Sequence, residues 1–217
     1  MEYRNEDLII KYDIIADKII SLHKNNSLRD RFFPLMIDSL RFKTGIEIGS
    51  DKGEFAEHLL SKSKLEKLYC VDPWIDDFGS DHREGYYDKN GDVRFNQCAT
   101  TLNKYLAQNR CELIRAKSVE AYQDNDLPEL FDFCYVDGDH SLDGIYNDIH
   151  LWTHRVRVGG IIAGHDYKDG KNSGMSDYFG NQLPYMVKSV VDNYCLQYGY
   201  KLNIVGGVLK SWWFVKV

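Results

Sequence analysis

The sequence lacks the features of several large classes of protein. No apolar run reaches the roughly 18 residues that a membrane-spanning helix requires, and the polar, acidic segment 1–7 is unlike a secretory signal peptide. No strongly basic stripe is present and the net charge is −6, which argues against a nucleic-acid partner held by phosphate contacts. These absences predict a cytoplasmic protein with no membrane span and no nucleic-acid partner.

Cysteine is also sparse, and its spacing indicates no special chemistry. The 217 residues include five cysteines, none of them in a C-x-x-C pair, and no Cys/His pattern has zinc-binding spacing. We therefore expect reduced, mostly buried thiols that pack in the core. The cysteines are Cys70, Cys98, Cys111, Cys134 and Cys195.

Strand and helix patterns alternate along most of the chain. The length suffices for one full domain, which we expect over 1–217, with an N-terminal helical cap over 1–43 and a core over 44–217; a domain cut from a longer protein would have the same features. Strands are expected at 45–49, 67–72, 111–115, 131–137, 159–164, 200–205 and 212–217. Helices are expected at 8–22, 27–40, 54–61, 94–109, 142–156 and 183–198. This alternation predicts an α/β fold with a mostly parallel sheet, helices on both faces and one added antiparallel strand.

Two irregular segments, 74–93 and 167–182, are rich in Gly, Asp and Tyr. A long loop in a compact domain is commonly functional. Its aromatic rings could stack on a sugar or close over a cofactor, or they could be ordinary surface and packing groups. The tyrosines concerned are Tyr86, Tyr87, Tyr167 and Tyr178.

Acidic residues stand at the ends of most of the expected core strands. In open α/β sheets, ligands bind beyond the carboxyl ends of the strands. We therefore expect these acids to gather at one pocket. They are Glu47, Asp72, Asp137 with Asp139, and Asp166.

The first of these acids begins a glycine-containing turn. Glu47 to Gly53 follows the pattern E-x-G-x-x-x-G and contains Ser50. Gly49 allows a tight turn and a close approach to a ligand, and Gly53 allows close packing where a helix starts. An acid before the glycines suits a ligand with a cationic end, such as the ammonium and sulfonium of S-adenosylmethionine (SAM). The alternative is an ordinary strand–turn–helix junction.

Asp72 lies 25 residues after Glu47, where a carboxylate can accept both ribose hydroxyls. Pro73 and Trp74 could form the floor of an adenosine pocket, and Ser118 stands where the adenine edge would fall. The alternatives are a solvated Asp72 and a Trp74 that belongs to the core. Together these features predict an adenosine-containing cofactor, held by Glu47, Gly49, Ser50, Gly53, Asp72, Pro73, Trp74, Ser118 and Asp137.

A second group of residues suits a divalent cation. Asp137 and Asp166 end neighbouring strands, and their carboxylate oxygens are ligands that Mg²⁺ and Mn²⁺ accept. His165 as a third ligand would favour Mn²⁺ or another softer ion over Mg²⁺. The alternatives are that Asp137 contacts the cofactor or caps a helix, and that His140 and His165 only donate or accept hydrogen bonds.

Four segments, in order over about residues 44–167, carry a family resemblance: TGIEIGSDKGEFAEHLL, LYCVDPW, FDFCYVDGDHSLDGIYNDIHLW and GGIIAGHDY. They resemble class I SAM-dependent methyltransferases of the macrocin O-methyltransferase-like (Methyltransferase 24) type. The resemblance implies a Rossmann-like, seven-stranded sheet with SAM beside the first two strands. It also implies that Glu47, Gly49, Gly53 and Asp72 hold SAM, that Asp137 and Asp166 coordinate the cation, and that Asp139 is a candidate general base. Such relatives often have two adjacent acids where this chain has His165-Asp166.

The expected reaction is O-methylation of a sugar, a glycan or a glycosylated small molecule. A sugar hydroxyl is a poor nucleophile, so we expect a metal and a base to activate it, the base being Asp139, His140 or His165. Alternatives are a phenolic or catechol-type acceptor, a nitrogen acceptor, a non-catalytic binding module and a nicotinamide-dependent sugar enzyme. The last would need a G-x-G-x-x-G turn near residue 49, which is absent. A homodimer is a further expectation.

Overall fold

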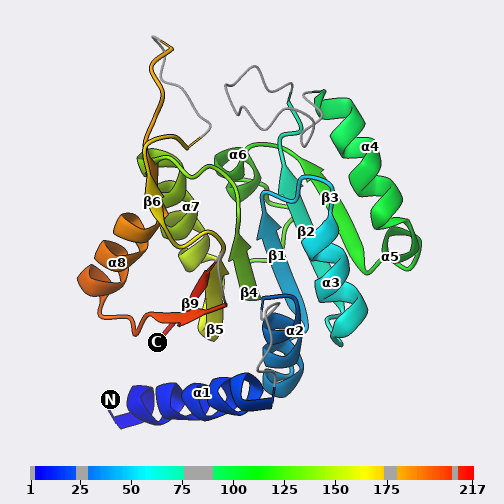
Figure 1. The fold of residues 1–217 in the computed structure, drawn as a ribbon. Coiled ribbons are helices and arrows are strands. Elements are labelled where there is room, and N and C mark those ends of the chain that lie inside the picture. The colour runs from blue at the N-terminus through cyan, green and yellow to red at the C-terminus, as the bar shows by residue number, and fades with distance from the viewer. Residues whose placement is uncertain (1–2, 23–28, 76–89, 174–179, 207–209) are drawn as a thin grey trace.

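The computed structural model describes residues 3–22, 29–75, 90–173, 180–206 and 210–217, and its fold is drawn in Figure 1. The helices are α1 (Tyr3–Leu22), α2 (Arg29–Leu40), α3 (Glu54–Lys62), α4 (Gly91–Thr101), α5 (Asn103–Ala107), α6 (Ser118–Tyr122), α7 (Leu142–His154) and α8 (Val187–Tyr198). The strands are β1 (Thr44–Ile48), β2 (Lys67–Asp72), β3 (Cys111–Arg115), β4 (Phe131–Val136), β5 (Val156–Gly164), β6 (Asp169–Gly170), β7 (Tyr185–Met186), β8 (Asn203–Val205) and β9 (Ser211–Val215). The expected helix start at Ser27 and the residues Tyr86, Tyr87 and Tyr178 lie outside the described residues.

Seven strands form one sheet in the order β3-β2-β1-β4-β5-β9-β8. The first five pair in parallel, whereas β9 runs antiparallel to both β5 and β8. The predicted α/β sheet with one antiparallel strand is therefore confirmed. The chain runs outward from β1 to β3 and then returns to β4 on the other side of β1. In open α/β sheets, ligands bind at the carboxyl ends of the strands beside such a reversal.

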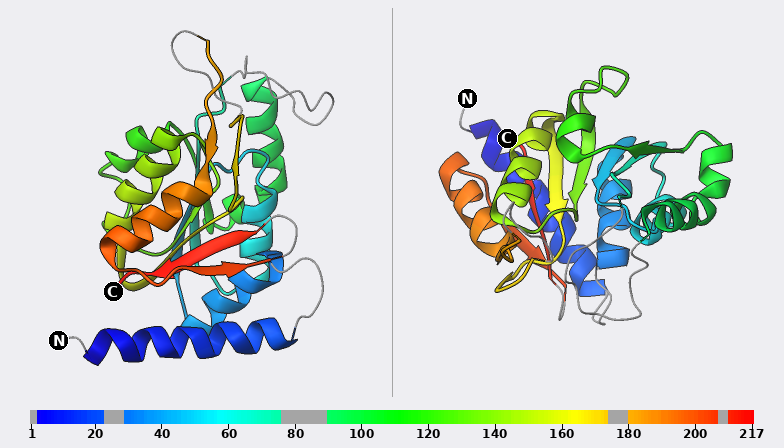
Figure 2. Two further views of the ribbon diagram at one scale, coloured as in Figure 1. Left: turned by 60° about the vertical axis from the view of Figure 1, so that its left-hand side comes forward. Right: turned by 90° about the horizontal axis from the view of Figure 1, so that it is seen from above.

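Helices cover both faces of this sheet (Figure 2). Apolar side chains of α1 to α5 pack in one cluster with residues such as Cys70 and Tyr135 of the sheet. Apolar side chains of α6 to α8 pack in a second cluster with residues such as Ile46 and Ile48. The sheet is therefore the middle layer of three, and α1 lies across the amino ends of the strands (Figure 1).

The alternation of side chains along β1 determines where its acid points. Successive residues of a strand face opposite sides of the sheet. Ile46 and Ile48 pack in the cluster with α6 to α8, so Glu47 faces the layer of α2 and α3. In register, Glu47 has Cys70 of β2 on one side and Tyr135 of β4 on the other. A buried carboxyl thus sits at the strand reversal, with 2% of its surface exposed.

The helix expected over 94–109 differs from the observed one in two ways. It begins earlier, at Gly91, because the Asn90 side chain accepts a hydrogen bond from the Val93 N–H (3.1 Å) and caps it. It also divides after Thr101 into α4 and α5. Just before the break, the hydroxyls of Thr100 and Thr101 donate to carbonyls four residues back (2.7 and 2.9 Å), a contact that often bends helices.

The helix expected from Leu183 begins only at Val187. Pro184 explains the difference, because proline disfavours helical backbone at the residue before it and donates no hydrogen bond. Residues 185–186 instead pair with 169–170 as the short β7 and β6. Earlier in the chain, β5 begins at Val156 rather than at the expected Gly159, with an irregular register against β4.

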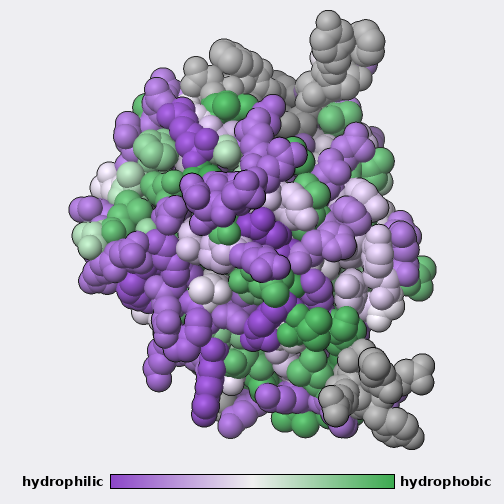
Figure 3. All heavy atoms as spheres, turned by 180° about the vertical axis from the view of Figure 1, so that it is seen from behind, coloured by the Kyte–Doolittle hydropathy of each residue, from purple (hydrophilic) through white to green (hydrophobic). Residues whose placement is uncertain are grey.

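The surface is mixed in character. The face turned away from the viewer in Figure 1 carries mostly hydrophilic side chains with apolar groups between them (Figure 3). Among the described residues, no helix combines the length and the apolar character that crossing a membrane demands.

Candidate active site

Backbone hydrogen bonds connect three strand ends at the turn between β1 and α3. The Gly49 N–H donates to the carbonyl of Val71 (2.8 Å), and the Asp137 N–H donates to that of Ile48 (2.7 Å). Gly49 has φ +90°, and a Cβ atom there would lie 2.2 Å from the Asp137 carbonyl oxygen. Only glycine meets both requirements. The turn therefore brings the ends of β1, β2 and β4 to one place.

Glu47 lies beneath this turn and is enclosed by protein. Its carboxyl accepts a hydrogen bond from the Ser50 hydroxyl (2.7 Å). Burial raises the pKa of Glu47 to about 8, with Asp137 and Asp72 adding to the rise, while the Ser50 hydrogen bond and Arg29 oppose it. Asp72 and Asp137 thus lie close enough to Glu47 to raise its pKa, as expected of a shared site.

Asp72 organises the neighbouring turn. One carboxylate oxygen accepts from the Asp51 N–H (3.0 Å) and the other from the Trp74 N–H (2.8 Å). Burial raises the pKa of Asp72, and these two hydrogen bonds oppose the rise. Trp74 itself is fully buried, and its indole N–H donates to the Asp51 carbonyl (2.7 Å). The Trp74 ring therefore packs in the core beneath the turn. Pro73, which precedes it in the sequence, is half-buried.

Ser118 is the first residue of α6. Its hydroxyl accepts a hydrogen bond from the Trp152 indole N–H (2.8 Å) and also bonds Asp148 on α7. Burial raises the pKa of Asp148 to about 7. Asp148 was not predicted as a site residue. Its signal in the sequence is an acid on the apolar face of α7, among Ile145, Ile149 and Trp152.

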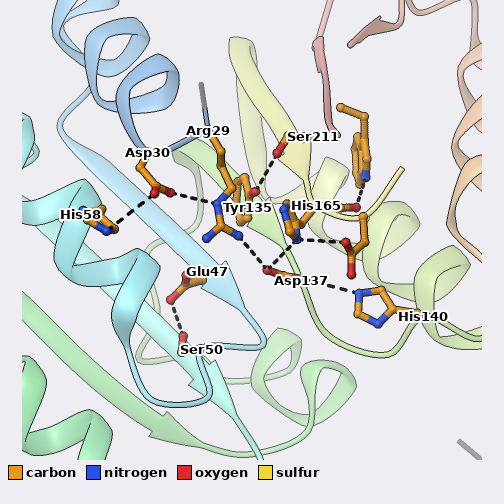
Figure 4. A network of polar contacts seen from close by, with 12 residues as sticks. Arg29, Asp30, Glu47, Ser50, His58, Tyr135, Asp137, His140, His165 and Ser211 are labelled. Atoms are coloured by element: carbon orange, nitrogen blue, oxygen red, sulfur yellow. Dashed lines mark hydrogen bonds and ion pairs between the residues drawn. The ribbon is translucent and has the colours of Figure 1, made fainter. Parts of the chain in front are cut away.

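The second predicted group gathers around Asp137 (Figure 4). Asp137, His140 and Asp166 each offer one ligand atom, and these atoms all lie within 4.8 Å of one another. His165 joins them, because its Nδ1 is 3.8 Å from Asp137 Oδ2 and 3.3 Å from Asp166 Oδ1. The ends of β4 and β5 thus bring two carboxylates and two imidazoles together.

The charges within this group shift one another's ionisation. Desolvation favours the neutral form of Asp137, but a hydrogen bond with His140 and the charges of His165, His140 and Arg29 outweigh it and lower its pKa. The pKa of His140 is raised, because its hydrogen bond to Asp137 and the nearby carboxylates outweigh desolvation. Burial lowers the pKa of His165. Asp137 is therefore held as a carboxylate.

Two buried atoms of this group, His140 Nε2 and Asp166 Oδ1, make no hydrogen bond of good geometry among the residues that the structure describes. Their nearest charged neighbours are Asp137 Oδ1 at 3.5 Å and His165 Nδ1 at 3.3 Å. Buried polar atoms are rarely left so, and an ion is one common explanation. His140 is fixed by stacking on Tyr185, with ring centroids 4.7 Å apart. Asp166 has φ +52°, a conformation that non-glycine residues seldom adopt. One nitrogen and several carboxylate oxygens form a donor set that fits Mn²⁺ or Mg²⁺.

Asp139 points elsewhere. Its Oδ1 accepts from the Ser141 N–H (2.8 Å), and its carboxyl group lies against Gly144, where a Cβ atom would be 2.2 Å from Asp139 Cγ. An acid in this position stabilises the first turn of α7. Of the three residues predicted as bases, the structure therefore brings His140 and His165 to Asp137 and holds Asp139 at the start of a helix.

Arg29 is a member of the site that the sequence did not reveal. It starts α2, and its Nη1 is 3.6 Å from Asp137 Oδ2 while its Nε donates to Asp30 (3.1 Å). Its guanidinium carbon lies 4.6 Å from the ring centroid of Phe55. The sequence predicted an N-terminal helical cap over 1–43, but no motif distinguishes Arg29 from other arginines.

The comparisons with known proteins agree with this geometry. Residues 46–167, more than half of the chain, match the family model described as a methyltransferase domain. An uncharacterised protein of Acanthamoeba polyphaga mimivirus is 26% identical over 164 residues. That alignment covers 75% of this chain and 66% of the viral protein, so the chain spans just under two thirds of that relative's length.

Several solved structures share the fold. An O-methyltransferase from Bacillus cereus in complex with SAH has a TM-score of 0.60 and 14% identity, covering 97% of this chain and 91% of that one. A candidate caffeoyl-CoA O-methyltransferase from Staphylococcus aureus has a TM-score of 0.63 and 12% identity, covering 94% and 91%. An O-methyltransferase family protein from Burkholderia thailandensis has a TM-score of 0.54 and 12% identity, covering 86% and 57%. At these identities the likeness shows the fold alone.

Proposed function

Because the chain belongs to this methyltransferase domain family and has the fold of class I O-methyltransferases, we propose that it methylates a hydroxyl of a sugar, a glycan or a glycosylated small molecule with SAM, assisted by a divalent cation. One observation carries the proposal. At the point where the strand order reverses, the Gly49 N–H donates to the Val71 carbonyl (2.8 Å) and the Asp137 N–H to the Ile48 carbonyl (2.7 Å), so the strand ends that carry the acids Glu47, Asp72 and Asp137 lie together. We infer that these acids at three strand ends serve one site.

The residues around the glycine turn suit SAM, which supplies an already activated methyl group. Asp72 has two carboxylate oxygens that each accept one backbone N–H and keep lone pairs for the ribose hydroxyls. Glu47 and Asp137 suit the ammonium. Gly49, Ser50 and Gly53 shape the turn, while Trp74 and Pro73 support it from below. Ser118 would lie at the adenine edge.

Asp137 and Asp166, together with His140 or His165, would hold the cation. When bound, the ion would supply Lewis acidity that lowers the pKa of an acceptor hydroxyl. The histidine that does not bind the ion is then the proton acceptor we favour. Asp139 is less suited to that role, because its Oδ1 already accepts from the Ser141 N–H (2.8 Å).

The acceptor is the least constrained part of the proposal. Tyr167, which could have stacked on a sugar, donates its hydroxyl proton to Asp192. A phenolic acceptor is the second candidate, favoured by the structural likeness to the Staphylococcus aureus protein. A nicotinamide-dependent sugar enzyme is disfavoured by the turn sequence. Tyr167 and Lys171 do have the Tyr-x-x-x-Lys spacing of such enzymes, but the Tyr167 hydroxyl is occupied by Asp192.

The described cysteines are free and buried, in line with a reducing compartment. This supports the proposal of a cytoplasmic protein. We also propose that residues 1–43 form a helical cap on a core of 44–217, since α2 packs against α3 beside the site and α1 packs against α2.

Transfer from methyl-labelled SAM onto a panel of glycans and catechols, with Mg²⁺, with Mn²⁺ and with EDTA, tests the proposal. We expect labelled sugar, and a loss of roughly 100-fold or more with EDTA or in Asp137→Ala. The exposed Asp143 on α7 provides a matched control, and Asp143→Ala should keep full activity. Full activity of Asp137→Ala in EDTA would refute the proposed role of a divalent cation. Label found only on catechols would refute a sugar as the acceptor. Stabilisation of the protein by NAD but not by SAM would refute SAM as the methyl donor.

A further inference from the structure

Arg29 is a cation placed among the acids of the site. Its Nη1 lies 3.6 Å from Asp137 Oδ2, and its charge acts on the ionisation of Glu47 as well. The arginine comes from α2, whereas the two acids end β1 and β4. Figure 4 shows the guanidinium and Asp137 pointing toward one another, with Glu47 nearby. A guanidinium between two carboxyls creates a small region in which both signs of charge are available.

The guanidinium is held in place by groups other than these two acids. Its Nε donates to Asp30 (3.1 Å), and its carbon lies 4.6 Å from the centroid of the Phe55 ring. Asp30 is in turn 3.8 Å from His58 Nε2 on α3. The 3.6 Å separation from Asp137 is too long for a good hydrogen bond. Arg29 therefore stays positioned, with donors to spare, if Asp137 is occupied by another ligand.

SAM ends in an α-amino acid group, with an ammonium and a carboxylate on one carbon atom. Acids that attract the ammonium would repel the carboxylate next to it, unless a cation stood within a few ångströms. Arginine is the residue that best matches a carboxylate, through two parallel N–H donors. We propose that Arg29 binds the carboxylate of the amino-acid end of SAM, beside Asp137, whose carboxylate attracts the neighbouring ammonium. This inference rests on the proposed use of SAM.

The proposal makes Arg29 a specificity residue for the donor. It distinguishes SAM and its demethylated product S-adenosylhomocysteine from analogues without the carboxylate. The decarboxylated form of S-adenosylhomocysteine keeps the ammonium, and 5′-methylthioadenosine lacks the whole amino-acid end. Affinity for these three compounds therefore reports separately on the carboxylate, the ammonium and the nucleoside.

Isothermal titration calorimetry of the wild type, Arg29→Met and Arg29→Lys with the three compounds provides the test. We expect Arg29→Met to weaken the affinity for S-adenosylhomocysteine by roughly 10-fold or more. The affinity for the other two compounds should change less than about twofold. Arg29→Lys should recover part of the loss, because lysine keeps the charge without the bidentate geometry. Arg31→Met, at an exposed arginine of the same helix, should bind like the wild type.

Several results would overturn the inference. If Arg29→Met weakened the affinity for all three compounds equally and also lowered the melting temperature, Arg29 would have a structural role. Unchanged affinity for S-adenosylhomocysteine with a raised KM for the acceptor would mean that Arg29 serves the acceptor instead. A wild type that binds none of the three compounds would refute the proposed use of SAM itself, and so is distinguishable from a failure of Arg29 alone.

Discussion

Glu47 is a carboxyl group whose protonation is linked to folding. Burial raises its pKa from the ordinary value of 4.5 to about 8. For an acid with a raised pKa, the folded protein favours the neutral form, so folding is most favoured below the pKa of the unfolded chain and loses stability as the pH rises toward the folded pKa. The relevant window runs from about pH 4.5 to about pH 8. Across it, ionisation of Glu47 opposes folding in the absence of a cationic ligand.

Replacing Glu47 with glutamine should remove this pH dependence. Glu47→Gln can still accept the Ser50 hydrogen bond (2.7 Å in the wild type) but cannot ionise. We expect wild type and variant to be similarly stable near pH 4.5, and the variant to be more stable at pH 8–9 by on the order of a few kcal/mol. Urea unfolding at a series of pH values measures the difference. A constant difference across the whole range would show that Glu47 does not titrate in this window.

At the level of residues, the sequence revealed the acids but not their partners. Glu47, Asp72 and Asp137 follow apolar strand patterns, and strand ends meet at one edge of a parallel sheet. Asp148 has only a weak sequence signal, an acid on the apolar face of α7, and Arg29 has none, because only the packing of α2 against the rest of the fold decides which of its side chains reaches the site. That packing depends on contacts far apart in the chain, such as those between α2 and α3, which no local pattern encodes.

At the level of elements, the junction of β1 and α3 is the structural centre of the site. Gly49 brings its backbone to that of Asp137, and a Cβ atom there would lie 2.2 Å from the Asp137 carbonyl oxygen. Gly199, which ends α8, has a comparable positive φ (+71°) but no atom within 4 Å of its Cβ position. Alanine substitutions at the two glycines can therefore be compared: both strain a left-handed backbone, but only the substitution at Gly49 adds steric overlap with Asp137.

The variant Gly49→Ala should therefore be far more harmful than Gly199→Ala. We expect Gly199→Ala to cost about 1–2 kcal/mol, the strain of a left-handed conformation, and Gly49→Ala to cost about 3 kcal/mol or more because overlap with Asp137 is added. Gly49→Ala should also lose SAM binding, since the ends of β1 and β4 must separate. Denaturant unfolding and calorimetry measure the two effects. Equal costs at both positions would mean that the strand ends move apart easily.

Elements with strong periodicity were predictable, and the short ones were not. The β2 and β4 segments stand out as short, mostly apolar runs. The two-residue β6 and β7 exist because residues 169–170 and 185–186 meet across the fold, and two residues cannot show a period. The five-residue α6 is likewise too short to show helical spacing. These elements follow from the tertiary structure rather than from local propensity.

At the level of the whole molecule, strand order is what brings the site together. Alternating patterns predict parallel strands, but they do not say that β4 pairs with β1 rather than with β3. The family resemblance implied a Rossmann-like, seven-stranded sheet, and the order of its strands is seen only in the structure. Because β4 and β5 are neighbours, Asp137, His140 and Asp166, together with His165, meet at one edge although more than 20 residues separate the first from the last.

A cation bound there would join segments that unfolding separates, and it should therefore stabilise the folded chain. At 100 times its dissociation constant, a ligand specific for the folded state adds ~2.7 kcal/mol, which for a chain of this size raises the melting temperature by about 5–10 °C. Differential scanning fluorimetry with increasing Mn²⁺ or Mg²⁺ measures the shift. Asp166→Asn should reduce it strongly, whereas Asp143→Asn, at an exposed acid on α7, should keep it. A shift that is equal in both variants would mean that the ion binds elsewhere on this acidic protein, because the ligand set would then have no part in it.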